Sequence, residues 1–120
     1  QYDIDVAVFD MGYNAPGAFD KMTPYDCARL GKALGAKVLI PDHWENWANS
    51  TSDPEMLVRQ FESIAADICP ECKTVIMRCG GRFEYPKDQD IKRYRYSDQS
   101  ENFRIEHSRY ADLLKKQTDR

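Results

Sequence analysis

The chain has 120 residues, of which 42% are hydrophobic and 31% are charged, so it can form one globular domain with a moderate core. Its 17 basic and 20 acidic residues give a formal net charge of -3, which offers no electrostatic attraction to nucleic acid. No apolar run approaches the roughly 20 residues needed to span a bilayer, so no membrane partner is expected.

Two further features concern the compartment and the upstream sequence. The four cysteines do not form the dense pattern of a secreted disulfide scaffold, which predicts a reducing compartment and a cytoplasmic location. The acidic opening segment does not resemble a signal peptide. Gln1 is not an initiator methionine, which leaves open that sequence upstream has been lost.

The first predicted strand runs from Ile4 to Phe9 and ends in a continuous apolar stretch, as is typical of a buried strand in a parallel sheet. The glycines, proline and asparagine of 10–17 then predict a loop at the functional edge of that sheet. Asp10 and Asn14 are polar groups at this edge, although such residues more commonly close a turn.

The next element is a helix with clear start and stop signals. Thr23 is a favoured N-cap, Pro24 suits the first helical position, and Asp26 can complete a capping box. Gly35 should end the helix in the left-handed conformation. The apolar face is expected to consist of Cys27, Leu30, Gly31 and Leu34.

The pattern then repeats along the chain. Lys37 to Pro41 is a short buried strand, and Asp53 with Pro54 begins a second helix. Thr74 to Met77 is a further strand. The apolar stripe of the second helix is expected at Leu57, Phe61, Ile64, Ala65 and Ile68. The order of strands and helices predicts an α/β layer with right-handed crossovers.

The last third of the chain gives weaker signals. Arg82 to Pro86 is expected to be extended, and the mixed charged and aromatic residues from Lys92 to Tyr96 suit an exposed edge strand. Residues from Ser108 to Lys116 are compatible with a helix.

His43 is the candidate metal ligand, because it follows the second strand at the edge where open α/β sheets build their sites. Asp42 and Glu45 are near enough in sequence to assist it, but a single histidine here is also compatible with an ordinary hydrogen-bonded residue. Trp44 and Trp47 flank the loop, either as a pocket wall or as ordinary core.

The Cys69-x-x-Cys72 pair permits a redox or zinc-binding interpretation. It falls at a predicted helix C-terminus, where the helix dipole disfavours a thiolate. No second pair completes a four-cysteine site, although Cys79 is nearby. A module whose function depends on the thiols of Cys69 and Cys72 therefore stays open as one interpretation of the chain.

Many separate positions, taken together, form a pattern that extends from about Asp3 to Phe103. Its residues include Gly12, Asn14, Gly17, Asp20-Lys21-Met22-Thr23, Asp26, Arg29, Gly31, Ala36-Lys37-Val38, Ile40-Pro41, His43, Trp47, Asn49, Asp53-Pro54, Gly80-Gly81, Phe83, Pro86 and Asp88. This pattern resembles the L-ascorbate-6-phosphate lactonases of the metallo-β-lactamase superfamily.

The resemblance implies that residues 1–120 are a single partial domain, the C-terminal half of an αββα sandwich with a mixed sheet and flanking helices. The family's main metal motif, His-x-His-x-Asp-His, would lie upstream, and His43 would be the final histidine ligand. The implied cofactor is a divalent metal, manganese or zinc, that activates water to open a phosphorylated lactone. Asn14 would line the substrate pocket.

The chain also departs from the family pattern. Trp44 replaces a second histidine and Glu45 replaces an aspartate. These changes are compatible with the metallohydrolase class, but they weaken the prediction that the substrate is an ascorbate phosphate. With one matched ligand, the chain alone is expected to be inactive and to hold no stoichiometric metal. The alternative is a freestanding α/β module that acts by association with a partner or with itself, for example as a homo-oligomer.

Overall fold

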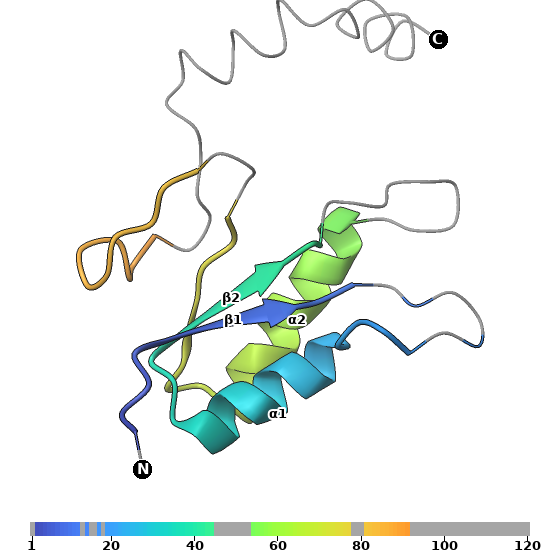
Figure 1. The fold of residues 1–120 in the computed structure, drawn as a ribbon, viewed down its shortest axis with the longest axis horizontal. Coiled ribbons are helices and arrows are strands. Elements are labelled where there is room, and N and C mark those ends of the chain that lie inside the picture. Colours follow the sequence, from blue (N-terminus) through green and yellow to red (C-terminus); the bar gives the residue numbers. More distant parts are fainter. Residues whose placement is uncertain are drawn as a thin grey trace, which may run out of the picture.

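The computed structural model describes residues 2–12, 14, 17, 19–44, 54–77 and 81–91. Strands and helices alternate along these residues (Figure 1). In chain order the elements are β1 (Val6–Asp10), α1 (Pro24–Leu34), β2 (Val38–Asp42), α2 (Pro54–Ile68) and β3 (Lys73–Thr74). This order confirms the predicted α/β class.

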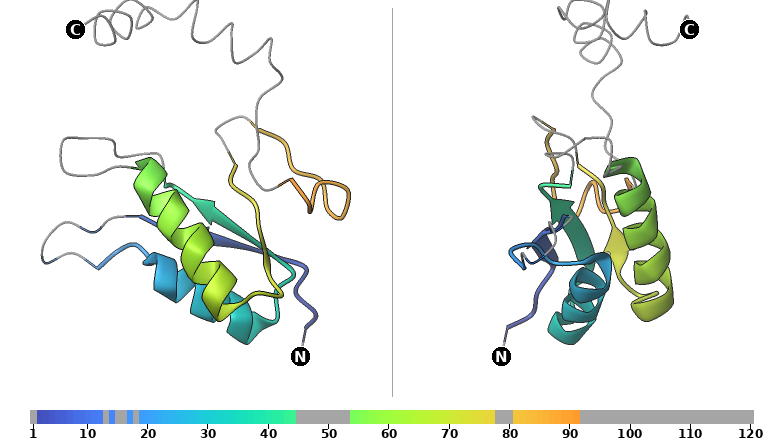
Figure 2. Two further views of the ribbon diagram at one scale, coloured as in Figure 1. Left: turned by 180° about the vertical axis from the view of Figure 1, so that it is seen from behind. Right: turned by 90° about the vertical axis from the view of Figure 1, so that its right-hand side faces the viewer.

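The three strands form one parallel sheet in the order β1-β2-β3. Val6 of β1 pairs with Val38 of β2, and the register continues until Asp10 lies beside Asp42. Both helices cover the same face of the sheet, as Figure 2 shows from the side. Where a mixed sheet was expected, the described strands are all parallel.

Strand boundaries differ from the expectation by small shifts. β1 and β2 each extend one residue further than predicted, to Asp10 and Asp42. β3 is shorter than the predicted Thr74–Met77 stretch, although Val75 and Ile76 just after it are buried. These extensions carry both aspartates onto the paired ends of the strands.

The capping box predicted for α1 is present. The Thr23 hydroxyl accepts a bond from the Asp26 backbone N–H at 3.2 Å, and an Asp26 carboxylate oxygen accepts from the Thr23 N–H at 3.0 Å. That carboxylate oxygen also accepts from the Thr23 hydroxyl at 2.8 Å. At the other end Gly35 adopts the left-handed conformation with φ 64°, as predicted for a C-cap.

The buried face of α1 matches the prediction at Cys27 and Gly31 but not at the two leucines. Leu30 and Leu34 are 41% and 42% exposed, whereas Ala28 is fully buried. The reason is a close approach of the helix to β2: a Cβ at Gly31 would lie only 2.5 Å from a methyl carbon of Leu39. The helix rests on its smallest side chains and turns its leucines outward. The buried residues of α1 are Pro24, Cys27, Ala28 and Gly31.

The face of the sheet under the helices holds the larger core, in which Phe61 of α2 and Leu39 of β2 are fully buried. The stripe predicted for α2 is largely confirmed, with Ile64 and Ile68 partly buried. The buried residues of α2 are Leu57, Val58, Phe61 and Ala65.

The opposite face of the sheet is only partly covered. Phe83 and Tyr85 pack on a small cluster around Val38 and Ile40. The predicted extended piece Arg82 to Pro86 forms no strand, because residues 85–90 turn back on themselves. On β1 the cover is incomplete: Val6 packs against this cluster, whereas Val8 is 63% exposed.

The expected strand from Lys92 to Tyr96 and the expected helix from Ser108 to Lys116 lie outside the described residues. Among the helices that the structure describes, none has the length and apolar character required to cross a bilayer.

The capping box generates a prediction about acid stability. Hydrogen bonds from the Thr23 N–H, and next from its hydroxyl, lower the pKa of Asp26 from its usual value of 3.8. The ionised carboxylate therefore stabilises the fold above the unfolded-state pKa, and this contribution is lost as the pH falls through the lower folded-state pKa. We expect Asp26→Asn to reduce the free energy of unfolding by about 1 kcal/mol or less at neutral pH.

Urea unfolding of both proteins across the acidic range measures this effect. The two stability curves should converge at the lowest pH, where Asp26 is protonated in both states of the wild type. A constant difference at all pH values would contradict a role for the ionised carboxylate.

Candidate functional site at the carboxyl edge of the sheet

The candidate site lies where β1 and β2 end. Parallel pairing places Asp10 beside Asp42, and His43 follows immediately. The backbone N–H of Met11 donates to the Asp42 carbonyl at 3.1 Å, which continues the pairing past the end of β1. Polar side chains from segments more than 30 residues apart thus meet at one edge, as is typical of open α/β sheets.

His43 is held in an uncommon backbone conformation. Its φ of 61° is in the left-handed region, which non-glycine residues rarely adopt. The Asp42 carboxylate accepts a bond from the His43 backbone N–H at 2.9 Å and so supports the turn. An energetically unfavourable conformation at the end of a strand is a common feature of functional sites.

The imidazole of His43 contacts the carboxylate of Asp10. The distance from Nδ1 to an Asp10 oxygen is 2.6 Å. Because an ionised carboxylate can only accept, Nδ1 carries the proton when the ring is neutral, and Nε2 keeps its lone pair. Nε2 is 3.8 Å from Asp42, and the side chain is 45% exposed. A histidine oriented by a carboxylate, with its other nitrogen free to accept, has the arrangement of many metal ligands.

A lysine completes the cluster. The Lys21 ammonium lies 3.0 Å from the other Asp10 oxygen. It is brought there because Met22 pairs with Met11 at the base of the loop. Hydrogen bonds from His43 first, and then from Lys21, lower the pKa of Asp10. Asp10 is therefore an anion shared by two donors at the sheet edge.

Asn14, the predicted substrate-binding residue, lies in the same loop. Its side-chain amide donates to the Lys21 carbonyl at 3.0 Å, and its oxygen accepts from the Lys21 N–H at 2.9 Å. Both ends of the amide group thereby hold the backbone of Lys21. The substrate role of Asn14 stays a prediction; the visible contacts fix the loop that carries Lys21.

The two tryptophans beside the site have different outcomes. Trp44 is 6% exposed, belongs to the main core, and donates from its indole N–H to the Met77 carbonyl at 3.1 Å. Trp44 was expected to be either a pocket wall or ordinary core, and the structure shows it as part of the core. Trp47 and the assisting residue Glu45 lie outside the described residues.

Within the described ranges, His43 is not part of a cluster of three or more metal-ligating side chains. The donors present are one imidazole nitrogen and neighbouring carboxylates, which suit a divalent metal but fill only part of its coordination shell. The sequence places Asp10 at the functional edge, with closure of the turn as its commoner role, but does not pair it with His43. That pairing depends on the register that sets the ends of β1 and β2 side by side.

Similarity to known proteins covers most of the chain. Over 96 residues, or 80% of the chain, it is 38% identical to proteins described as probable L-ascorbate-6-phosphate lactonase UlaG from Escherichia coli strains HS and SE11. This similarity confirms the predicted resemblance to the lactonases of the metallo-β-lactamase superfamily. The chain covers 27% of the length of these relatives. No protein-family model matches it.

The Asp10 contacts generate the second prediction. Since the hydrogen bond with His43 is the main cause of the lowered pKa of Asp10, His43→Ala should raise that pKa toward its usual value of 3.8. Lys21→Met should raise it by less. Carboxyl-carbon NMR titration of Asp10 measures both. A larger effect of the lysine variant, or no effect of either, would show that the imidazole is not the main partner of Asp10.

Proposed function

We propose that this chain is part of a metal-dependent hydrolase that resembles L-ascorbate-6-phosphate lactonase. The observation that carries the proposal is the Asp10–His43 pair, with Nε2 left to accept at the carboxyl edge of the sheet. A carboxylate partner fixes the tautomer and orientation of a ligating histidine and raises its basicity.

The other metal ligands would come from the rest of the protein. Because the chain covers 27% of its relatives' length, most of a lactonase-sized protein lies outside it. We infer that residues 1–120 form a C-terminal portion of an αββα sandwich. The exposed Val8 face of β1 supports this inference, since an apolar sheet face of a sandwich needs a covering layer.

The residues at the edge would have distinct roles in such an enzyme. His43 would hold the metal through Nε2, and Asp10 would position the ring. Lys21 would balance the charge of Asp10, and Asn14 would hold the loop beside the substrate. A divalent metal, manganese or zinc, would lower the pKa of a bound water and polarise the lactone carbonyl. The substrate would be a small phosphorylated lactone, and the compartment the cytoplasm.

A second candidate is an α/β module that acts by association. The same open face of β1 favours it, because exposed apolar surface also serves contacts between chains. It gives no reason for the oriented imidazole of His43, so the hydrolase accounts for more of the structure.

The third prediction concerns the chain by itself. With a single oriented histidine, residues 1–120 should hold no equimolar metal at the His43 site and should not hydrolyse L-ascorbate 6-phosphate. Elemental analysis after desalting, and a lactone hydrolysis assay with added Mn²⁺ or Zn²⁺, measure this. A Cys69→Ser/Cys72→Ser protein is the right material, because it removes cation binding by these thiols.

Hydrolysis of the lactone by the Cys69→Ser/Cys72→Ser protein would contradict the proposal that the other metal ligands lie outside residues 1–120.

The hydrolase proposal itself is tested by the sequence upstream of Gln1. The reading frame there should encode a His-x-His-x-Asp-His run. In the protein that includes this run, His43→Ala should reduce both metal content and hydrolysis. Lys32→Ala, an exposed change on α1, is the matched control and should retain both.

A further inference from the structure

A second constellation of metal-ligating groups lies at the opposite edge of the sheet, in the turn between α2 and β3. Cys69 follows α2 directly and is fully buried, and it forms a disulfide with the partly buried Cys72. The Cys72 backbone N–H donates to the Cys69 carbonyl at 2.9 Å, and the two Cα atoms are 5.3 Å apart. This tight turn holds both sulfur atoms on one side of the chain.

Glu71 adds a third donor to the pair. One ligand atom each from Cys69, Glu71 and Cys72 lie within 4.8 Å of one another, the one cluster of three such groups in the described ranges. In a tetrahedral zinc site with metal–sulfur distances of about 2.3 Å, ligand atoms lie about 3.8 Å apart. To share one ion, the Glu71 oxygen must move inward by up to about 1 Å, and the two sulfur atoms must separate once the disulfide is reduced.

The electrostatics of the turn favour a cation over free thiolates. The last turn of α2 contains no basic residue, and Asp67 lies within it. The C-terminal end of a helix carries partial negative charge, which attracts cations and raises the energy of an unpaired thiolate. A nucleophilic thiolate is disfavoured here, whereas a thiolate neutralised by a metal ion is compatible with the site.

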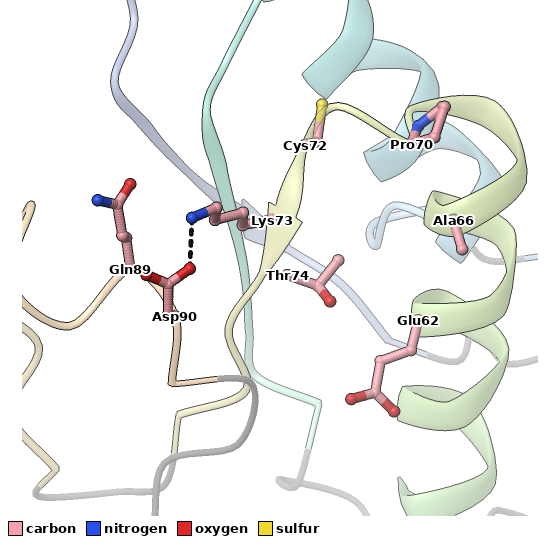
Figure 3. Close-up of a pocket in the computed structure, with 8 residues that line it drawn as sticks. All are labelled: Glu62, Ala66, Pro70, Cys72, Lys73, Thr74, Gln89 and Asp90. Carbon is pink, nitrogen blue, oxygen red and sulfur yellow. Dashed lines mark hydrogen bonds and ion pairs between the residues drawn. The ribbon is translucent and has the colours of Figure 1, made fainter.

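A pocket of about 350 Å³ lies beside the pair. Cys72 and Pro70 form one end of it, and Glu62 lines it from α2 (Figure 3). The Cys72 sulfur points away from Glu62 and Asp90, and Cys72 packs against the main core. Lys73 pairs with Asp90 at the side away from α2. Since Cys72 is only partly buried whereas Cys69 is fully buried, an external thiol or a hydrated cation would approach through Cys72.

We propose that Cys69, Cys72 and Glu71 form a redox-gated site for a thiophilic divalent cation such as Zn²⁺. In the oxidised form the disulfide excludes the ion. Two molecules of a small monothiol reduce the disulfide and leave as their own disulfide, which gives two protein thiols. Binding of M²⁺ then forms two metal–sulfur bonds and releases two protons, while Glu71 supplies an oxygen and water completes the shell.

The site is separate from the other thiol that the structure describes. Cys27 lies on the buried face of α1, and burial raises the pKa of its thiol to about 12. Cys27 is therefore not expected to provide a thiolate to an added cation. Oxidation and cation binding exclude each other at Cys69 and Cys72, so the redox state of the compartment decides which form is present.

Cobalt(II) is the probe, because thiolate ligands give it strong near-ultraviolet charge-transfer absorption. The chain is prepared with Cys79→Ser, reduced with dithiothreitol, desalted without oxygen and titrated with Co²⁺. We expect one cobalt per chain with thiolate absorption, displaced by Zn²⁺. Cys72→Ser and Cys69→Ser should each weaken binding at least tenfold, and Glu71→Gln severalfold. Cys27→Ala and Lys32→Ala should leave it unchanged.

Re-oxidation to the Cys69–Cys72 disulfide should abolish the absorption, and reduction should restore it. The proposal is overturned if the reduced chain shows no thiolate–cobalt absorption, or if Cys72→Ser binds as tightly as its parent. Equal binding by the oxidised form would also overturn it. Because the readout is thiolate–cobalt absorption, to which His43 cannot contribute, failure of this site leaves the hydrolase proposal untouched, and the reverse also holds.

Discussion

The parallel pairing of β1 with β2 is the constraint on which the candidate site depends. The register that sets Val6 beside Val38 also sets Asp10 beside Asp42, so the two strands end together. A shift of one residue would turn every side chain of a strand to the other face and would separate Asp10 from His43. The alternating burial of Ala7 and Phe9 against exposed Val8 holds this register, because only one face of β1 lies under the helices.

Local signals along the chain were sufficient to predict the elements of the fold. Thr23 with Asp26, and Gly35 at φ 64°, act through contacts within a few residues, so sequence alone locates both ends of α1. The rotation of α1 could not be predicted in this way. It depends on the meeting of Gly31 with Leu39 of β2, a contact between elements that turns Leu30 outward.

The candidate site shows the same contrast between features that are local in sequence and contacts between distant elements. The position of His43 after a buried strand was readable from the sequence, because strand ends are marked by local composition. Its partner was not, since the contact with Asp10 spans 33 residues and requires the strand register. The Cys69-x-x-Cys72 spacing is visible in the sequence as a motif, whereas the disulfide and the proximity of Glu71 depend on the turn geometry. The two candidate cation sites thus occupy opposite ends of one sheet and use different ligand chemistry.

The tautomer of His43 tests the central claim most directly. Long-range proton–nitrogen NMR, recorded at a pH where the ring is neutral, distinguishes a protonated Nδ1 from a protonated Nε2. We expect the proton on Nδ1, facing Asp10, with Nε2 free to accept, and we expect Asp10→Ala to remove this preference. A proton found on Nε2 in the unaltered chain would contradict the account, because the nitrogen assigned to the metal would then be a donor.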